Sequence, residues 1–233
     1  MADNLSAEQE KMMRENSLAF FGAITASVTH EMNNYIAIID QTSGLLSDLL
    51  SFSEGEIILK KERLQSIVDK IDRNTRRGVA LLKRLNTFAH CVDSPESEFE
   101  LNDMIDNFVQ LTQRLAKMKK LELLFEKTDE QIKLISNPFI IQEILIYYLR
   151  IFFTSSPAEG IINFTVSSDN NLITVSIKSG KTDNPPVFSE NEYIDMLVEK
   201  ISAKITASAA VEGSSVILSI PIDKLMIQQP NQR

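Results

Sequence analysis

A histidine, a glutamate and an asparagine stand close together near the start of the chain, at His30, Glu31 and Asn34. Imidazole changes its charge near neutral pH and can act as a nucleophile, and a neighbouring carboxylate can orient it or take its proton. Asn34 follows His30 by four residues, so both side chains share one face if the segment is helical. The spacing therefore suits nucleophilic chemistry at His30. The simpler alternative is an ordinary exposed histidine followed by a glutamate.

The segment around His30 has the pattern of a long amphipathic helix. It contains no proline from about Ser6 to Phe52, and apolar or small residues recur at steps of three or four. These residues are Phe21, Ile24, Val28, Met32, Tyr35, Ile39, Thr42, Leu46 and Leu49. His30 follows Val28 by two positions, about 200° around a helix, and we expect it to face solvent.

A second helix follows turn-forming residues at Ser53–Glu56 and ends before Pro95. Its apolar stripe is Leu64, Ile67, Ile71, Gly78, Leu82, Leu85 and Ala89. The two segments predict an antiparallel hairpin about 50–60 Å long. A hairpin cannot cover all of its own apolar surface, so we expect a homodimer whose two hairpins form a four-helix bundle.

The pattern changes after Pro95 to alternating short strands and helices. We expect helices at Asn102–Lys119, Pro138–Phe153 and Glu190–Ile205, and strands at Phe99–Leu101, Leu121–Glu126, Ile132–Ile135, Gly160–Ser167, Leu172–Ser179, Thr206–Val211 and Ser215–Ile220. This order predicts an α+β protein in which an α/β sandwich, one mixed sheet with helices on one face, follows the hairpin. The predicted domains are residues 1–94 and 95–225, with a tail at 226–233.

Composition excludes several classes of function. A single cysteine and two histidines that stand 60 residues apart argue against an internal disulfide and a metal site. The net charge of −8 argues against nucleic-acid binding. The chain shows neither an apolar run long enough to cross a membrane nor a signal peptide, and we expect a cytoplasmic protein.

The charge is uneven along the chain. Nine basic and three acidic residues lie between Lys60 and Arg84, so this segment carries +6 and the remainder −14. Such a strip is either a solvated helix face or a guide for an acidic partner. In an antiparallel hairpin Arg76, Arg77 and Lys83 flank the level of His30, and we predict that they bind the partner.

Residues 28–38, Val-Thr-His-Glu-Met-Asn-Asn-Tyr-Ile-Ala-Ile, resemble the H-box of two-component histidine kinases. Residues 74–84 resemble the second helix of the same hairpin, and the element order in 97–223 resembles the kinases' ATP-binding domain. The resemblance implies that His30 accepts a phosphoryl group, that Glu31 is the adjacent acid or base, and that Asn34 positions a water or a phosphoryl group. Tyr35 stands where the family has proline, which predicts a straighter helix.

The residues that hold ATP in that family are replaced in this chain. The positions of the asparagines that hold magnesium and phosphate fall on Tyr147 and Ile151, and Lys178 or Ser179 stands where the adenine-binding aspartate belongs. The chain contains no G-x-G lid. Magnesium needs oxygen ligands and phosphates need exposed backbone N–H groups. We therefore expect no ATP binding, no cofactor and no metal.

The sequence predicts a phosphotransferase without autokinase activity, which relays phosphoryl groups between His30 and the receiver-domain aspartates of response regulators. Two alternatives stay open. One is a phosphatase or pseudokinase regulator of a response regulator, in which Asn34 matters more than phosphorylation of His30. The other is a dimeric adaptor whose second domain is only a docking surface.

Overall fold

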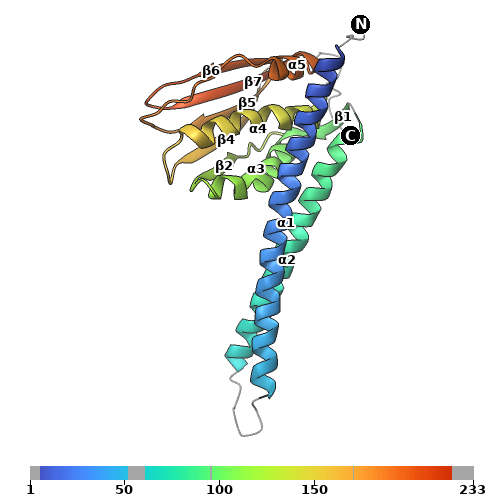
Figure 1. The fold of residues 1–233 in the computed structure, drawn as a ribbon, viewed down its shortest axis with the longest axis vertical. Coiled ribbons are helices and arrows are strands. Elements are labelled where there is room, and N and C mark those ends of the chain that lie inside the picture. Colours follow the sequence, from blue (N-terminus) through green and yellow to red (C-terminus); the bar gives the residue numbers. More distant parts are fainter. Residues whose placement is uncertain (1–5, 52–60, 95, 170, 222–233) are drawn as a thin grey trace, which may run out of the picture.

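The computed structural model describes residues 6–51, 61–94, 96–169 and 171–221. Two long helices, α1 (Ala7–Ser51) and α2 (Lys61–Ala89), lie side by side and antiparallel, and a short 3-10 helix, η1 (His90–Val92), follows them (Figure 1). Both predicted helices are confirmed. α1 continues without a break through Tyr35, where the backbone N–H that a proline would lack is retained. The predicted turn at 53–56 and the predicted tail at 226–233 lie outside the described residues.

The second part of the chain is an α/β sandwich, so the predicted α+β class is confirmed. Its helices are α3 (Leu101–Lys117), α4 (Pro138–Ser155) and α5 (Glu192–Lys200). Its strands are β1 (Ser97–Glu100), β2 (Glu122–Glu126), β3 (Lys133–Ser136), β4 (Ile161–Asp169), β5 (Leu172–Ser179), β6 (Lys204–Ser208) and β7 (Ser214–Pro221). The division at residues 94 and 95 stays a prediction.

The strands form two sheets, whereas the sequence predicted one mixed sheet. Five strands have the order β2-β4-β5-β7-β6, with β2 parallel to β4 and the other pairs antiparallel. β1 and β3 form a separate antiparallel pair. Each of these two strands has four residues and leads directly into a helix, α3 or α4, so the pair ends before it can join the larger sheet.

The region after β5 also differs from the prediction. α5 was expected to reach Ile205 but ends at Lys200, and β6 begins at Lys204 rather than Thr206. Ser202 has a φ of 51°, which ends the helical conformation. The β-branched Ile205 and Thr206 then pair with Leu218 and Ile217 of β7, because cross-strand packing suits branched side chains.

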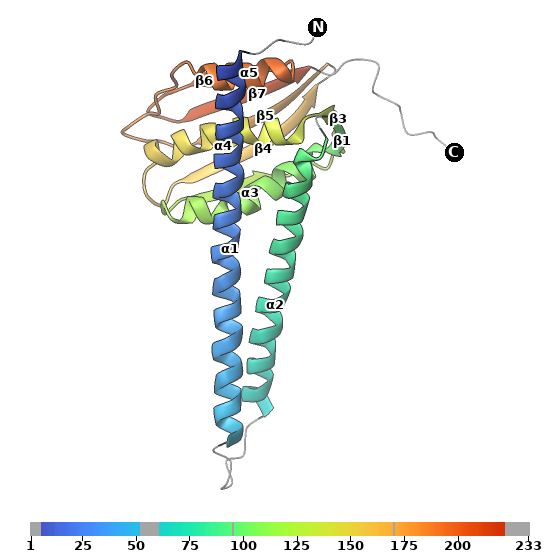
Figure 2. The same ribbon diagram turned by 45° about the vertical axis from the view of Figure 1, so that its right-hand side comes forward.

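The helices of the second domain cover one face of the five-stranded sheet, and α1 crosses the outer side of those helices (Figure 2). The core between sheet and helices is apolar, and its fully buried residues include Phe108, Ile144, Leu149, Phe152 and Phe164. None of the described helices is long and apolar enough to span a bilayer.

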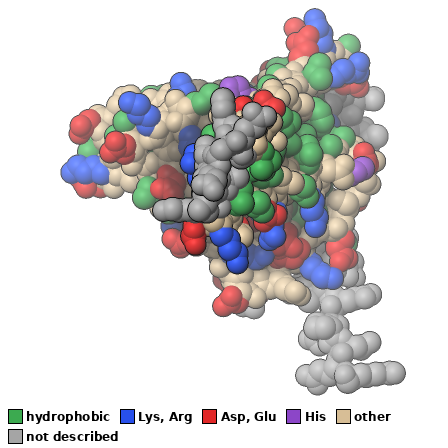
Figure 3. Space-filling view, turned by 90° about the horizontal axis from the view of Figure 1, so that it is seen from below, with side chains coloured by type: hydrophobic (Ala, Val, Ile, Leu, Met, Phe, Trp, Pro, Cys, Tyr) green, Lys and Arg blue, Asp and Glu red, His purple; other side chains and the backbone are tan. Residues whose placement is uncertain are grey.

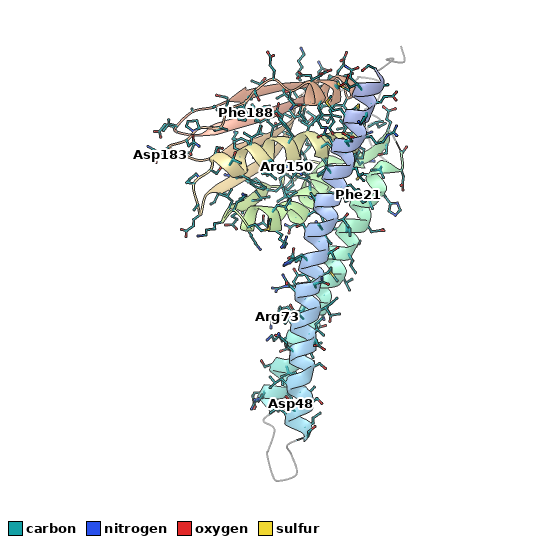
Figure 4. The ribbon with its side chains drawn as sticks, in the orientation of Figure 1. Phe21, Asp48, Arg73, Arg150, Asp183 and Phe188 are labelled. Atoms are coloured by element: carbon teal, nitrogen blue, oxygen red, sulfur yellow. The ribbon has the colours of Figure 1, made fainter. Side chains whose placement is uncertain are left out.

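The upper part of the hairpin is tied to the second domain by aromatic rings and an ion pair. Phe20 of α1 and Phe88 of α2 pack on one another and on Phe139 of α4, with ring centroids 5.4–5.9 Å apart. Arg84 of α2 pairs with Asp106 of α3 at 2.8 Å. The lower part of the hairpin, where Asp48 and Arg73 lie, projects away from the domain (Figure 4). That lower part is open to a partner.

Candidate functional site

His30 lies on the exposed surface of α1, two residues beyond the buried Val28, as the helical pattern predicted. Its Nδ1 atom is 3.4 Å from the Nδ2 atom of Asn34, one turn further along the helix. The amide thus stands beside one ring nitrogen, and within the described part of the chain no protein group bonds to the other. Nε2 is therefore the ring nitrogen that has no described protein partner.

The amide of Asn34 can hold the imidazole in either neutral form. A nucleophilic Nε2 needs a free lone pair, so the proton must lie on Nδ1. Rotation of the Asn34 amide by half a turn presents its oxygen, which accepts a hydrogen bond from Nδ1–H. Asn34 can therefore orient the ring and also select the tautomer that reacts.

The Glu31 carboxylate is held by a tyrosine. The Tyr35 hydroxyl donates to Glu31 Oε1 over 2.6 Å, and no other described residue forms a hydrogen bond with this carboxylate. Burial, the hydrogen bond to Glu31 and the charge of Glu31 raise the pKa of Tyr35 to about 12, and the charge of Arg77 acts in the opposite direction. The hydroxyl therefore stays a donor at neutral pH. The sequence predicted Glu31 as a site residue but gave no role to Tyr35.

The close approach of the two helices fixes this tyrosine. Gly78 of α2 lies opposite Met32 and Tyr35, where an added Cβ would be 3.3 Å from Met32 Cε and 3.9 Å from Tyr35 Cδ2. Glycine at this position lets α1 and α2 approach at the level of His30. The same approach brings the charge of Arg77, on the neighbouring position of α2, to the Tyr35 hydroxyl.

The three basic residues predicted to bind the partner have different surroundings. Arg77 acts on the Tyr35 hydroxyl, as described above. Arg76 Nε pairs with Asp72 Oδ2 of its own helix at 2.9 Å, and both side chains are exposed. Lys83 is exposed, and no described residue forms an ion pair with it. Their role in partner binding stays a prediction.

A shallow apolar groove runs along α1 and ends at the histidine. Its volume is about 540 Å³, and it is lined by Leu18, Phe21, Gly22, Thr25, Ala26, Thr29, His30 and Asn33. Hydrophobic side chains reach the surface beside the hairpin (Figure 3). On the hairpin, Leu18 and Ile36 of α1 are 71% and 56% exposed, and Val79 of α2 is 63% exposed. This face of the hairpin is apolar and uncovered.

A second groove lies between the two helices, further toward the end of α1. It has a volume of about 430 Å³ and is lined by Gln41, Thr42, Leu45, Arg63, Ser66, Ile67 and Lys70. The sequence placed Arg63 and Lys70 in the basic strip without assigning them to a site. Their spacing of seven residues, which puts both on one helix face, was the available signal.

Tyr147 and Ile151, which the sequence resemblance places where histidine kinases have asparagines, both lie on α4. Tyr147 lines a crevice of about 170 Å³ where α4 meets α1. The rings of Tyr148 and Phe152 both pack against Phe188. No three His, Cys, Asp or Glu residues gather as a metal site in the described ranges. The predictions that the chain binds no nucleotide and no metal stay predictions.

The crevice contains a buried carboxylate that sequence reasoning missed. Glu143 of α4 is 3% exposed, and its Oε1 atom accepts a hydrogen bond from the Tyr193 hydroxyl of α5 over 2.8 Å. Burial raises the pKa of Glu143, while hydrogen bonds from Ser17 and Tyr193 and the charge of Lys200 act against this shift. One carboxylate thus joins α1, α4 and α5, which ties the hairpin to the second domain.

The chain is similar in fold to solved structures of histidine kinases and of a bacterial phosphotransferase. Histidine kinase ThkA, solved in complex with response regulator protein TrrA, matches 96% of this chain and 69% of its own with 20% identity and a TM-score of 0.48. The Acinetobacter baumannii histidine kinase AdeS matches 84% of this chain and 98% of its own, with 14% identity and a TM-score of 0.45. A bacterial phosphotransferase matches 93% of this chain and 98% of its own, with 15% identity and a TM-score of 0.45. No family model and no curated protein matches the sequence.

Proposed function

We propose that the chain is a histidine phosphotransfer protein that relays phosphoryl groups between His30 and receiver-domain aspartates without using ATP. One observation carries the proposal. The imidazole of His30 is exposed on the hairpin, with Asn34 beside Nδ1 and with no described residue bonded to Nε2. A receiver domain can approach Nε2 from outside, because the second domain packs on the upper part of the hairpin.

The transfer needs no cofactor from this chain. The lone pair of His30 Nε2 attacks the phosphorus of an aspartyl phosphate, the bond from phosphorus to the carboxylate oxygen breaks, and the receiver recovers its ionised aspartate. The imidazole ring gains positive charge, which the Asn34 oxygen stabilises through Nδ1–H. The second receiver reverses these steps when its carboxylate attacks the phosphohistidine. The bulky residues at Tyr147 and Ile151 support a source of phosphate other than ATP.

The grooves of the hairpin support two kinds of partner. We propose that a second copy covers the apolar face, so that two hairpins form a four-helix bundle. Leu18, Thr25, Thr29 and Ile36 of α1 recur at steps of seven and four, and Val68, Thr75, Val79 and Leu82 of α2 recur at similar steps. We propose that the receiver binds at the groove between Arg63 and Lys70 and the basic surface near His30, since its phosphorylation site is acidic. The relay would operate in the cytoplasm.

Transfer of radiolabelled phosphate from a phosphorylated receiver tests the proposal. Wild-type protein should take up label that is lost in acid and stable in base, as expected of phosphohistidine, and His30→Ala should take up none. His90→Ala is the matched control, because His90 is also exposed but forms its own pair with Asp93 at 2.6 Å. Label on His90, or none on the wild type, would contradict the proposal.

The same assay separates the alternatives. A phosphatase would release inorganic phosphate from the receiver in an Asn34-dependent reaction that survives in His30→Gln. An adaptor would bind the receiver and leave its phosphate in place. The expectation that ATP does not bind comes from the residues that replace the family's nucleotide ligands, at Tyr147 and Ile151. Calorimetry with Mg-ATP should therefore detect no binding tighter than about 100 μM, or about −5.5 kcal/mol.

A further inference from the structure

Tyr35 stands between the candidate site and the second helix of the hairpin. Its hydroxyl donates to Glu31 Oε1, while its ring lies against α2 beside Gly78. Arg77, the residue before Gly78, places positive charge near the same hydroxyl. A surface glutamate normally samples several side-chain conformations. Glu31 is instead half-buried and bonded to a hydroxyl that is anchored in the contact between the helices.

We infer that Tyr35 is a positioning residue, which holds the Glu31 carboxylate beside His30 in one conformation for phosphoryl transfer. The inference rests on the proposed function and adds a residue to its site. The Tyr35 hydroxyl donates to Oε1, and no described residue forms a hydrogen bond with Oε2, so that oxygen is free to interact with the imidazole. No described hydrogen bond joins Tyr35 to His30, and in this proposal Tyr35 acts only through Glu31.

The charge changes of the reaction explain why a fixed carboxylate helps. When Nε2 bonds to phosphorus, the ring becomes cationic, and a negative charge at a set distance stabilises this state. A mobile carboxylate would have to be ordered during the reaction, which raises the barrier. The positive charge of Arg77 acts on the Tyr35 hydroxyl and opposes the rise in the pKa of Tyr35. Tyr35 thus connects Glu31, the residue after His30, with α2 through its hydrogen bond and its packing beside Gly78.

The experiment compares Tyr35→Phe, Glu31→Gln and the double variant. Tyr35→Phe keeps the ring that packs on Gly78 and removes only the hydroxyl. Phosphoramidate serves as the phosphoryl donor, because this small molecule needs no docking surface. Here kcat denotes the first-order rate constant for phosphorylation of His30 at saturating phosphoramidate, and KM the phosphoramidate concentration that gives half of this rate. We expect Tyr35→Phe to lower kcat about tenfold with little change in KM. In the Glu31→Gln background the same change should lower kcat less than about twofold, because the two residues act as one unit.

Tyr148→Phe is the matched control. Tyr148 is another half-buried tyrosine, on α4 and away from His30, and its loss of a hydroxyl should leave kcat unchanged. A melting curve for each variant separates catalysis from stability. Equal kcat in wild type and Tyr35→Phe, or an equal loss with and without Glu31, would overturn the inference. If the wild type itself takes up no phosphate, the proposed function fails as well.

Discussion

Gly78 of α2 faces Met32 of α1 so closely that a Cβ atom at position 78 would lie 3.3 Å from Met32 Cε. The first atom met is thus the end of a flexible side chain. This contact sets how closely the two helices approach, and with it the place of Tyr35. The site on α1 therefore depends on a residue of α2 that has no side chain.

Substitution of Gly78 tests this dependence. Gly78→Ala should change the free energy of unfolding by less than about 1 kcal/mol, because the gain in helix propensity offsets a small movement of Met32. Gly78→Ile should cost about 1–3 kcal/mol, because the larger side chain pushes the helices apart, and it should also slow phosphotransfer. Gly44→Ala is the control. Nothing lies within 4 Å of its added Cβ, so it should stabilise the hairpin. Urea denaturation measures all three.

The buried Glu143 predicts a pH dependence of stability. Burial raises its pKa above the ordinary value of 4.5, so the folded protein binds this proton more tightly than the unfolded chain does. Stability contributed by this group is therefore greatest at acid pH and falls as pH rises from the ordinary value through the raised one. Glu143→Gln removes this titration.

Urea melts of wild type and Glu143→Gln between about pH 4 and pH 8 should show the wild type losing stability relative to the variant as pH rises. Glu122→Gln, an exposed glutamate on β2, is the control and should run parallel to wild type. A constant difference between wild type and Glu143→Gln at all pH values would show that Glu143 titrates alike in the folded and unfolded states.

The apolar face of the hairpin predicts which charged substitutions separate a dimer and which unfold the hairpin. Val79 is exposed on this face, whereas Leu46 is half-buried toward α2. Val79→Glu should therefore give a folded monomer, because it disturbs only the contact with a second copy. Leu46→Glu should instead unfold the hairpin. Ala80→Glu changes the next, exposed residue outside this face and should stay dimeric. Sedimentation together with circular dichroism distinguishes these outcomes, and a monomeric wild type would refute the dimer.

Periodicity was enough to predict the long helices and most strands. The steps of three and four in α1 correctly placed Val28 inside and His30 outside. The same reasoning did not separate the two apolar faces of α2. It assigned Leu82 and Ile67 to one stripe, but Leu82 is 49% exposed and Ile67 is buried. One apolar stripe of α2 packs against α1 and the other is exposed. Both stripes have similar spacing in the sequence, so spacing alone does not tell which of them is buried.

Contacts between distant segments could not be predicted. The Glu31–Tyr35 pair is local by contrast, and its spacing of four residues on one helix was an available signal. The hydrogen bond between Glu143 and Tyr193 joins residues 50 positions apart. The sequence around neither residue predicts this contact. The end of α5 depends on the left-handed Ser202, a conformation that serine rarely adopts without tertiary support.

The basic strip of α2 gives the last prediction. Arg76 and Lys83 are exposed near the level of His30, and a receiver is acidic around its phosphorylation site. Attraction between the basic strip and an acidic receiver raises the rate at which the two proteins associate. At physiological salt this attraction is screened over about 8 Å. Arg76→Glu combined with Arg77→Glu should therefore slow transfer from a receiver at least about tenfold at low salt. The gap from wild type should narrow as salt rises.

Arg77 complicates this double variant, because its charge also acts on the Tyr35 hydroxyl. Arg76→Glu with Lys83→Glu isolates the surface charge, and transfer from phosphoramidate, which has no acidic surface to steer, is the internal control. Stability should change by less than about 1 kcal/mol, because the pair of Arg76 with Asp72 is exposed to solvent. Slower transfer from the receiver alone would identify steering. In the Arg76→Glu, Arg77→Glu variant, slower transfer from both donors would point to the Tyr35 contact. Unchanged transfer from the receiver in both double variants would mean that the strip is only a solvated helix face.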